Sequence, residues 1–498
     1  MRLICGAFFA CVITLAPFVR TGAAQSITQL QALQAPTELM LSADGSELYF
    51  RFGSDSWKIQ TSSGSKAVRS DERPPPANAR EIPKVDGTPR ASDAARSPDG
   101  TKIAYLASAK PEGALNLFCR CEGEHAGPRK LSDLPIRGCQ WAADSSSFWV
   151  LLSQGADVAF GLLSKDGSFR RMSSGPALRG VGGLTVVNDV VAWVQSDSSH
   201  YGTIWIRNKA GIVYQLWDAN PQTAAWSKAW TQEVVHWKNA HGEELQGVLA
   251  RPERPGRVPL IVDPYSGWRN RFLNIGVLGN YAFVQAGFAV FFPDHRAAFA
   301  FPISSFGDAY VGSAKDRDPV DVLTDDVMSG VEELVRRGDV DRNRMFLYSF
   351  STGASAIDQL LTQTTAFRAA VSFAGVSDWL GYYRANQPRG DNTIPNFLGG
   401  RRPEDSPGLY DRISPMKHVD LIHTPLLLAI GDKDSIPGGG SRYQDTLAFY
   451  NALQKAGRPV ELVVYRGQGH GLDNDEVVEQ HVAKAITFFR SHMPSETH

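Results

Sequence analysis

The stretch from Met345 to Ala356 constrains the fold of this chain more than any other part of it. Its first six residues, Met345 to Phe350, are apolar or aromatic except for one serine, which is typical of a buried strand. Small residues follow from Ser351 to Ala356, and Ile357 to Leu361 continue as a helix. The sequence therefore predicts a strand, a tight turn centred on Ser351 and a helix, in that order.

A strand, a tight turn and a helix around a central serine form the nucleophile elbow of an α/β-hydrolase. The turn holds the serine in a strained backbone conformation, so its neighbours must be small, and the usual pattern is Gly-x-Ser-x-Gly. Gly353 satisfies this requirement after Ser351, and Ser349 is a small residue in place of the first glycine. Taken alone, the stretch has an alternative interpretation as a strand that merely ends in serines.

Two later loops lie where an α/β-hydrolase has the acid and the histidine of its catalytic triad. The predicted strand Leu426–Ile430 is followed by Asp432 and Asp434, and the predicted last strand, Val460–Tyr465, is followed by His470 between two glycines. Both loops occur in the chain order that this fold requires. The elbow and the two loops together therefore support an α/β-hydrolase more strongly than any one of the three does alone.

These positions define a predicted triad. Ser351 would attack, His470 would take its proton and later protonate the leaving group, and the acid would hold the histidine tautomer and stabilise the imidazolium. We favour Asp434 as the acid and keep Asp432 as the alternative, since either aspartate can also simply cap a turn. Two further histidines on the predicted C-terminal helix are interpreted as surface or core residues: His481 and His492.

The N-terminal half contains a repeated phrase. An aspartate in a turn before an apolar strand occurs at Asp44, Asp99, Asp144 and Asp189. The intervals are about 45 to 55 residues, which is the period of a β-propeller blade. The sequence thus predicts a small all-β propeller of about four blades, complete or incomplete, and the alternative is a generic antiparallel sandwich.

The chain divides into two predicted domains after its N-terminal segment. Residues 25–225 are the propeller-like domain, in which 62–95, rich in serine, proline, arginine and aspartate, is a predicted flexible insertion. Residues 226–498 alternate strands with helices, which indicates a mostly parallel α/β sheet. The predicted helices in this part are Asp321–Arg337, Tyr443–Lys455 and Asp475–Ser491.

Residues 1–24 have the pattern of a secretory signal. Arg2 precedes the nearly all-apolar run from Leu3 to Val19, and small residues at 22–24 suit cleavage before Gln25. The alternative is a membrane anchor, which the short run interrupted by Pro17 disfavours. We therefore expect an exported protein, periplasmic or secreted, without stable membrane insertion.

Cysteine content and charge add two expectations. An oxidising compartment permits one disulfide, between Cys139 and either Cys119 or Cys121. The net charge of −1, with no long run of one sign, argues against nucleic acid as a partner. No glycine-rich phosphate loop or metal-ligand cluster occurs in the sequence, so no cofactor or metal is implied.

From about Trp226 to the C-terminus, about 270 residues, the chain resembles the catalytic domain of the prolyl oligopeptidase family of serine peptidases, which follows a β-propeller. The matching stretches are Asp263-Pro264-Tyr265-Ser266-Gly267, Asp325-Asp326-Val327, Asp341-Arg342-Asn343-Arg344, Ser414-Pro415, Thr424-Pro425-Leu426 and Gly467-Gln468-Gly469-His470-Gly471.

This resemblance implies further site residues. The hydroxyl of Tyr265 and the backbone N–H of Thr352 would form the oxyanion hole. An aromatic-walled pocket for a proline-sized or small apolar side chain would be formed by Val376, Trp379 and Tyr382. The alternative interpretation of these three residues, and of Tyr265, is ordinary core.

The chain also departs from the family pattern. Ala354 stands where a second glycine is common after the elbow. The run from Asp434 to Pro437 is one residue shorter than usual, so Asp432 stays a candidate for the acid. The glutamate pair with which dipeptidyl peptidases bind a free N-terminus has no recognisable counterpart, so a strict aminodipeptidase is not favoured.

The predicted function is an exported serine peptidase that cleaves short peptides through an acyl-enzyme, because a propeller over the site excludes folded proteins. One alternative on the same scaffold is an esterase or an isopeptidase, such as those that open lasso peptides. An alternative of another class is a non-catalytic binding protein on a degenerate hydrolase fold.

Overall fold

A computed structural model describes residues 33–494, except 73–91, 108–115, 122–128, 133–135, 155–156, 174–176, 179–182, 197–198, 266–279, 297–316, 387–394, 396–397, 399–400 and 437–439. The predicted signal segment, residues 1–24, lies outside the described residues. Within the described part of the chain, no helix is both long enough and apolar enough to span a bilayer.

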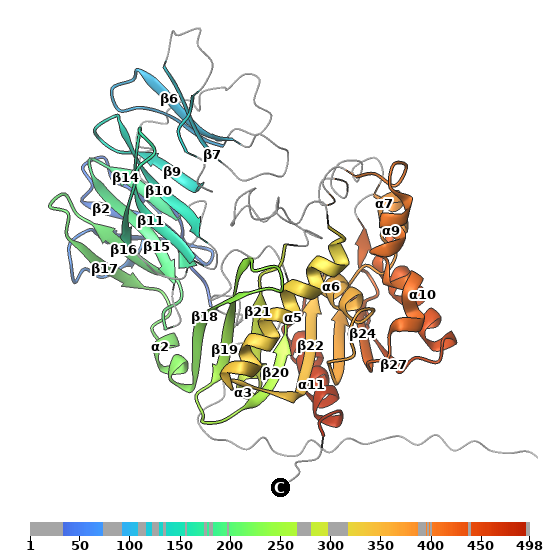
Figure 1. Ribbon diagram of the computed structural model, residues 1–498. Coiled ribbons are helices and arrows are strands. Elements are labelled where there is room, and N and C mark those ends of the chain that lie inside the picture. The colour runs from blue at the N-terminus through green and yellow to red at the C-terminus, as the bar shows by residue number, and fades with distance from the viewer. Residues whose placement is uncertain are drawn as a thin grey trace, which may run out of the picture.

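The described residues before Trp226 form four antiparallel sheets, one per predicted repeat (Figure 1). Each recurring aspartate lies in the turn between two neighbouring strands of its sheet, so the predicted blade period is confirmed. The strands are, in the first sheet, β1 Thr37–Leu41, β2 Glu47–Phe52, β3 Asp55–Gln60 and β4 Val68–Arg69; in the second, β5 Ser92–Arg96, β6 Lys102–Ala107, β7 Asn116–Cys121 and β8 Arg129–Lys130; in the third, β9 Ile136–Trp141, β10 Ser147–Gln154, β11 Asp157–Ser164 and β12 Phe169–Ser173; in the fourth, β13 Ala177–Leu178, β14 Leu184–Val187, β15 Val190–Ser196, β16 Thr203–Arg207 and β17 Val213–Asp218.

The aspartate turns connect the blades to one another. The N–H of Asp99 in the second blade donates to Ser145 Oγ in the third at 3.0 Å. Asn188 Nδ2 in the fourth blade donates to the carbonyl oxygen of Ala43 in the first at 3.2 Å. Phe160 of the third blade stacks on Trp193 of the fourth, with ring centroids 4.4 Å apart. The described contacts thus run from the second blade through the third and fourth to the first.

Two predictions for this domain need correction or stay open. Strand β4 completes the first blade and β5 begins the second, so both ends of the predicted insertion 62–95 belong to blades, and residues 73–91 lie outside the described residues. Cys119 and Cys139 are not joined to each other in the structure. The Cys121 side chain lies outside the described residues, so pairing through it stays a prediction.

An eight-stranded sheet follows, in the order β18-β19-β21-β20-β22-β23-β24-β27, with all strands parallel from β21 to β27. The prediction of a mostly parallel sheet is confirmed. The elbow strand begins at Val340 and not at Met345, because Val340 pairs with Val258 on the neighbouring strand. The strands are β18 Trp230–Lys238, β19 Glu244–Pro252, β20 Val258–Val262, β21 Ala289–Pro293, β22 Val340–Phe350, β23 Ala369–Phe373, β24 Leu426–Gly431 and β27 Val460–Tyr465, with a small hairpin of β25 Ser435–Ile436 and β26 Gly440–Ser441.

Helices cover both faces of this sheet (Figure 1). One buried cluster packs α5, α6 and α10 on one face, and a second packs α3 and α11 on the other. Helix α5 is capped by the Asp318 carboxylate at its start and ends at Gly338, whose φ is 83°. The helices are α2 Thr223–Trp226, η1 Ser227–Ala229, α3 Asn280–Gln285, α5 Pro319–Arg337, α6 Thr352–Leu360, α7 Trp379–Ala385, α9 Pro407–Arg412, η3 Pro415–Leu421, α10 Arg442–Lys455 and α11 Asp475–Ser491.

Candidate active site

Ser351 lies at the sharp turn between β22 and α6, with φ 56° and ψ −122°. A positive φ is unfavourable for a residue with a Cβ and costs about 1–3 kcal/mol, so the surrounding structure must hold it. The N–H of Ser351 donates to the carbonyl oxygen of Phe373 at 2.8 Å, and the N–H of Ser355 donates to the carbonyl oxygen of Ser351 at 3.1 Å. The turn is therefore anchored to the neighbouring strand and to its own helix.

The small residue at position 353 is required by close packing. A Cβ at Gly353 would overlap the Oγ of Ser349 and would lie 3.0 Å from the Cα of Tyr265. Glycine thus lets the start of α6 pass between the elbow strand and the loop after β20. This is the local geometry that the elbow pattern predicts.

Ser351, His470 and Asp434 form a hydrogen-bonded chain. His470 Nε2 lies 2.9 Å from Ser351 Oγ, and His470 Nδ1 lies 2.8 Å from Asp434 Oδ2. An ionised carboxylate only accepts, so Nδ1 carries the ring proton and Nε2 is the acceptor for the serine hydroxyl. This is the tautomer in which histidine can act as a general base.

The two candidate acids occupy different environments. Asp434 is 2% exposed and faces His470. Asp432 is partly exposed, and its Oδ1 accepts the N–H of Gly467 at 2.7 Å. Asp432 therefore caps a turn of the histidine loop, whereas the shortened loop still brings Asp434 to the histidine.

The acid loop and the histidine loop are joined by their backbones. The N–H of Lys433 donates to the carbonyl oxygen of Gln468 at 2.9 Å, and the N–H of Asp432 donates to that of Tyr465 at 3.1 Å. A Cβ at Gly431 would overlap the carbonyl oxygen of Gln468, so the close approach needs glycine there. These contacts fix the distance between the acid and the histidine.

Arg442 is a site residue that sequence reasoning missed. Its side chain is largely buried; Nε lies 3.9 Å from Asp434 Oδ1, and Nη2 donates to the hydroxyl of Tyr382 at 3.0 Å. A third contact runs from Nη1 to the carbonyl oxygen of Ala374 at 3.3 Å. The guanidinium thus balances the charge of the acid from the side opposite the histidine. The sequence did contain one signal for Arg442. A cation in the first turn of a helix is unfavourable next to the helix dipole unless a nearby anion or acceptor compensates for it.

The two predicted oxyanion donors both lie beside the elbow. Thr352 is the first residue of α6, so its N–H belongs to the helix terminus and has no acceptor within the helix. Tyr265 follows β20, with its Cα near the start of α6 as described above. Its N–H donates to Asp263 Oδ1 at 3.2 Å. Ser266 and Gly267 of the matching stretch lie outside the described residues.

The three predicted pocket residues divide between core and site. Val376 and Trp379 are 2% and 3% exposed and belong to the hydrophobic core behind the elbow. Tyr382 is partly exposed, and the guanidinium of Arg442 lies over its ring, 5.0 Å from the centroid. Of the three, Tyr382 is the one that is not buried, and Trp379 packs edge-on to its ring with the ring centroids 5.9 Å apart.

The two histidines set aside in the sequence are remote from this chain of hydrogen bonds. His481 is buried under the sheet, where burial lowers its pKa to about 4, and its Nδ1 lies 3.0 Å from the Tyr465 hydroxyl. His492 lies just beyond the end of α11, and its Nδ1 contacts the carbonyl oxygen of Phe488 at 2.8 Å. The expectation that they are core or surface residues is confirmed.

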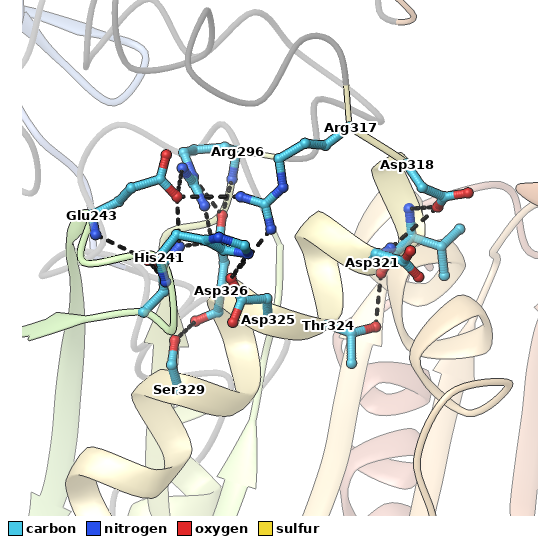
Figure 2. A network of polar contacts seen from close by, with 12 residues as sticks. His241, Glu243, Arg296, Arg317, Asp318, Asp321, Thr324, Asp325, Asp326 and Ser329 are labelled. Atoms are coloured by element: carbon cyan, nitrogen blue, oxygen red, sulfur yellow. Dashed lines mark hydrogen bonds and ion pairs between the residues drawn. The ribbon is translucent and has the colours of Figure 1, made fainter.

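A buried ion-pair network explains the matching stretch at Asp325 and Asp326 (Figure 2). Arg296, just after β21, donates from Nε to Asp326 Oδ2 at 2.9 Å and pairs with Glu243. Arg317 bridges Glu243 and Asp325, at 3.2 and 3.4 Å. Burial lowers the pKa of Arg296, but its bonds to Asp326 and Glu243 outweigh this and raise the pKa above its ordinary value, so the guanidinium stays charged. The network holds the chain after β21 against α5 and the turn after β18.

Comparison with known proteins places part of the chain in a family. Residues 278–496 match the family model described as "Prolyl oligopeptidase family", so this part of the chain is a domain of that family and the predicted resemblance is confirmed. The class of protein that the family and its relatives indicate is a serine hydrolase or peptidase.

Two curated relatives show the range of this similarity. The human acylamino-acid-releasing enzyme is 24% identical over 51% of this chain and 34% of its own length. The lasso peptide isopeptidase AtxE2 of Asticcacaulis excentricus is 26% identical over 52% of this chain and 37% of its own length. The chain thus matches about a third of the length of these relatives.

The likeness to solved structures extends over both domains. A puromycin-hydrolyzing peptidase of Mycobacterium tuberculosis superposes with a TM-score of 0.65 at 17% identity, covering 93% of this chain and 80% of the other. The Pyrococcus horikoshii acylaminoacyl peptidase gives a TM-score of 0.62 at 17% identity, covering 93% and 72%. The predicted fold class, a propeller followed by an α/β-hydrolase domain, is confirmed.

Proposed function

We propose that this protein is a serine peptidase that cleaves short peptides through an acyl-enzyme. The observation that carries the proposal is the hydrogen-bonded chain from Ser351 through His470 to Asp434. The family of residues 278–496 and the peptidase relatives support the same class of reaction.

In the proposed reaction each of these groups has its own role. His470 Nε2 takes the hydroxyl proton as Ser351 Oγ attacks the carbonyl carbon, and the imidazolium is stabilised by Asp434. Negative charge develops on the former carbonyl oxygen, and the Thr352 N–H and the Tyr265 hydroxyl are its proposed hydrogen-bond donors. His470 then protonates the leaving amine, and a water activated by the same histidine releases the acyl group.

A second candidate on the same scaffold is hydrolysis of an isopeptide bond. It is supported by the similarity to a lasso peptide isopeptidase, which matches as much of this chain as the human relative does. Turnover of a linear peptide library, matched esters and an isopeptide-linked peptide distinguishes the candidates by kcat/KM. An esterase would prefer the esters, and an isopeptidase the branched substrate.

A fluorophosphonate probe tests whether the protein is an enzyme at all, because only an activated serine reacts with it. The proposal expects labelling of the wild type and none of Ser351→Ala, with the Tm of the variant nearly unchanged. A folded wild-type protein that is neither labelled nor able to turn over any library member would contradict the proposal. It would favour a binding protein on a hydrolase fold.

We further propose that the protein is exported. The support is the apolar N-terminal run followed by small residues at 22–24. Expression of the full chain with N-terminal sequencing of the product tests this proposal. Maturation before Gln25 with recovery outside the cytoplasm is expected, and an intact N-terminus in the cytoplasmic fraction would contradict it.

A further inference from the structure

Ser349 occupies the elbow position that is usually glycine, and its side chain is hydrogen-bonded. Its hydroxyl donates to Asp263 Oδ1 at 2.6 Å, and both side chains are buried, with Ser349 fully so. Glycine at this position would leave that carboxylate oxygen without the hydroxyl donor. A buried carboxylate that loses a hydrogen bond is unfavourable, so the serine matters beyond being small.

The same oxygen of Asp263 reaches the oxyanion loop. Asp263 Oδ1 also accepts the backbone N–H of Tyr265 at 3.2 Å. This one carboxylate oxygen therefore connects Ser349, on the strand that ends at the nucleophile, with the backbone of Tyr265, the proposed oxyanion-hole donor. Ser349 and Asp263 are 86 residues apart in the sequence.

The opposite side of the loop is held as well. His295 is buried, and its Nε2 lies 3.0 Å from the carbonyl oxygen of Pro264. A carbonyl oxygen can only accept, so Nε2 donates in this contact. The segment from Asp263 to Tyr265 is thus fixed from β22 on one side and from the end of β21 on the other.

We infer that Ser349 is a positioning residue for the oxyanion hole, acting through Asp263 on Tyr265. The inference rests on the proposed function and assigns to the unusual elbow serine the role of aligning the tyrosine hydroxyl with the nucleophile. Because the hydroxyl of Tyr265 is needed mainly as charge develops, misplacing it acts on the transition state and not on substrate binding. A small misplacement of a catalytic group costs up to about 100-fold in rate.

The test compares Ser349→Gly and Ser349→Ala with the wild type, each also in a Tyr265→Phe background. We expect kcat to fall roughly tenfold in the wild-type background with KM nearly unchanged, which is part of the effect of removing an oxyanion donor. In the Tyr265→Phe background the same substitutions should cause little further loss, because the group that they position is absent.

Ser372 offers a matched control. Ser372 lies on the adjacent strand β23, and its hydroxyl donates to the buried carboxyl group of Asp358 in α6 at 2.9 Å. Ser372→Ala removes another buried serine–aspartate hydrogen bond and does not touch the segment Asp263–Tyr265, so it should change Tm but leave kcat unchanged. If the Ser349 variants do not fold, Asp263→Ala breaks the connection from its other end, and the same pattern of losses is expected.

Two results would overturn the inference. One is a Ser349→Gly protein with wild-type kcat, which would mean that serine is only a tolerated substitute for glycine. The other is an equal loss in both backgrounds, which would place the effect outside Tyr265. Fluorophosphonate labelling separates this failure from that of the proposed function. An unlabelled wild type contradicts the function, whereas equal labelling rates of wild type and Ser349→Gly contradict only the positioning role.

Discussion

Replacing Asp434 tests the catalytic role of its contact with His470 Nδ1. In Asp434→Asn the amide can present its NH₂ group to His470 Nδ1, which forces the ring proton onto Nε2. Nε2 then cannot accept the proton of Ser351, although it lies 2.9 Å from Oγ. If the amide presents its oxygen instead, the tautomer is kept but the negative charge beside the imidazolium is lost.

Both orientations of the amide predict a large loss. With Nδ1 and Oδ2 at 2.8 Å, the centres of the two charges are about 4 Å apart, and at an effective dielectric constant of 20 their attraction is about 4 kcal/mol. That is a factor of about 10³, and the wrong tautomer costs about 10⁴. We therefore expect kcat to fall by about 10³ to 10⁴ in Asp434→Asn.

Asp432→Asn is the matched control, two positions away in the same loop. Its amide oxygen can still accept the N–H of Gly467, so kcat should change by less than about tenfold. The assay is steady-state turnover of the best peptide from the library, with circular dichroism to verify folding. Equal losses in the two variants, or the reverse ranking, would refute the assignment of Asp434.

Three further predictions concern neighbouring residues. Tyr265→Phe should lower kcat by about 10² to 10³ with little change in KM, measured by steady-state kinetics; kcat within a few fold of wild type would remove the hydroxyl from the site. Gly353→Ala should lower Tm and activity, because the new Cβ overlaps Ser349 Oγ, and an unchanged Tm would refute the close packing. Burial raises the pKa of Asp445 to about 6, although its bonds to Ser377 and Asp378 lower it. Since the folded state holds this proton more tightly, denaturant titrations should show roughly 3 kcal/mol of stability lost as pH rises from about 4 to 6, and Asp445→Asn should remove this dependence.

The parts of the site that sequence predicts are those set by local pattern and strand order. The elbow turn depends on small residues beside Ser351, and His470 follows the last strand, so both were found without knowledge of the fold. The limits of strands were less predictable where a strand at the edge of a sheet consists of polar residues. The short strands β4 and β5 lie in a segment that composition marks as a flexible insertion.

The remaining features depend on contacts between distant residues. The sequence favours Asp434 over Asp432, but the backbone bonds between the two loops that bring Asp434 to His470 are encoded by no local pattern. The role of Arg442 depends on the first turn of α10 lying beside the acid. The bond from Ser349 to Asp263 joins β22 to the residue directly after the neighbouring strand β20, so in the sequence Ser349 is visible only as a departure from the elbow pattern.

The most direct test of the account is the identity of the residue that becomes covalently modified. The mature protein is treated with a fluorophosphonate, digested, and the modified peptide is sequenced by tandem mass spectrometry. We predict a single adduct on Ser351, which is lost in Ser351→Ala and forms at least about 10² more slowly in Asp434→Asn. An adduct on Ser349, or substrate turnover that persists in Ser351→Ala, would contradict it.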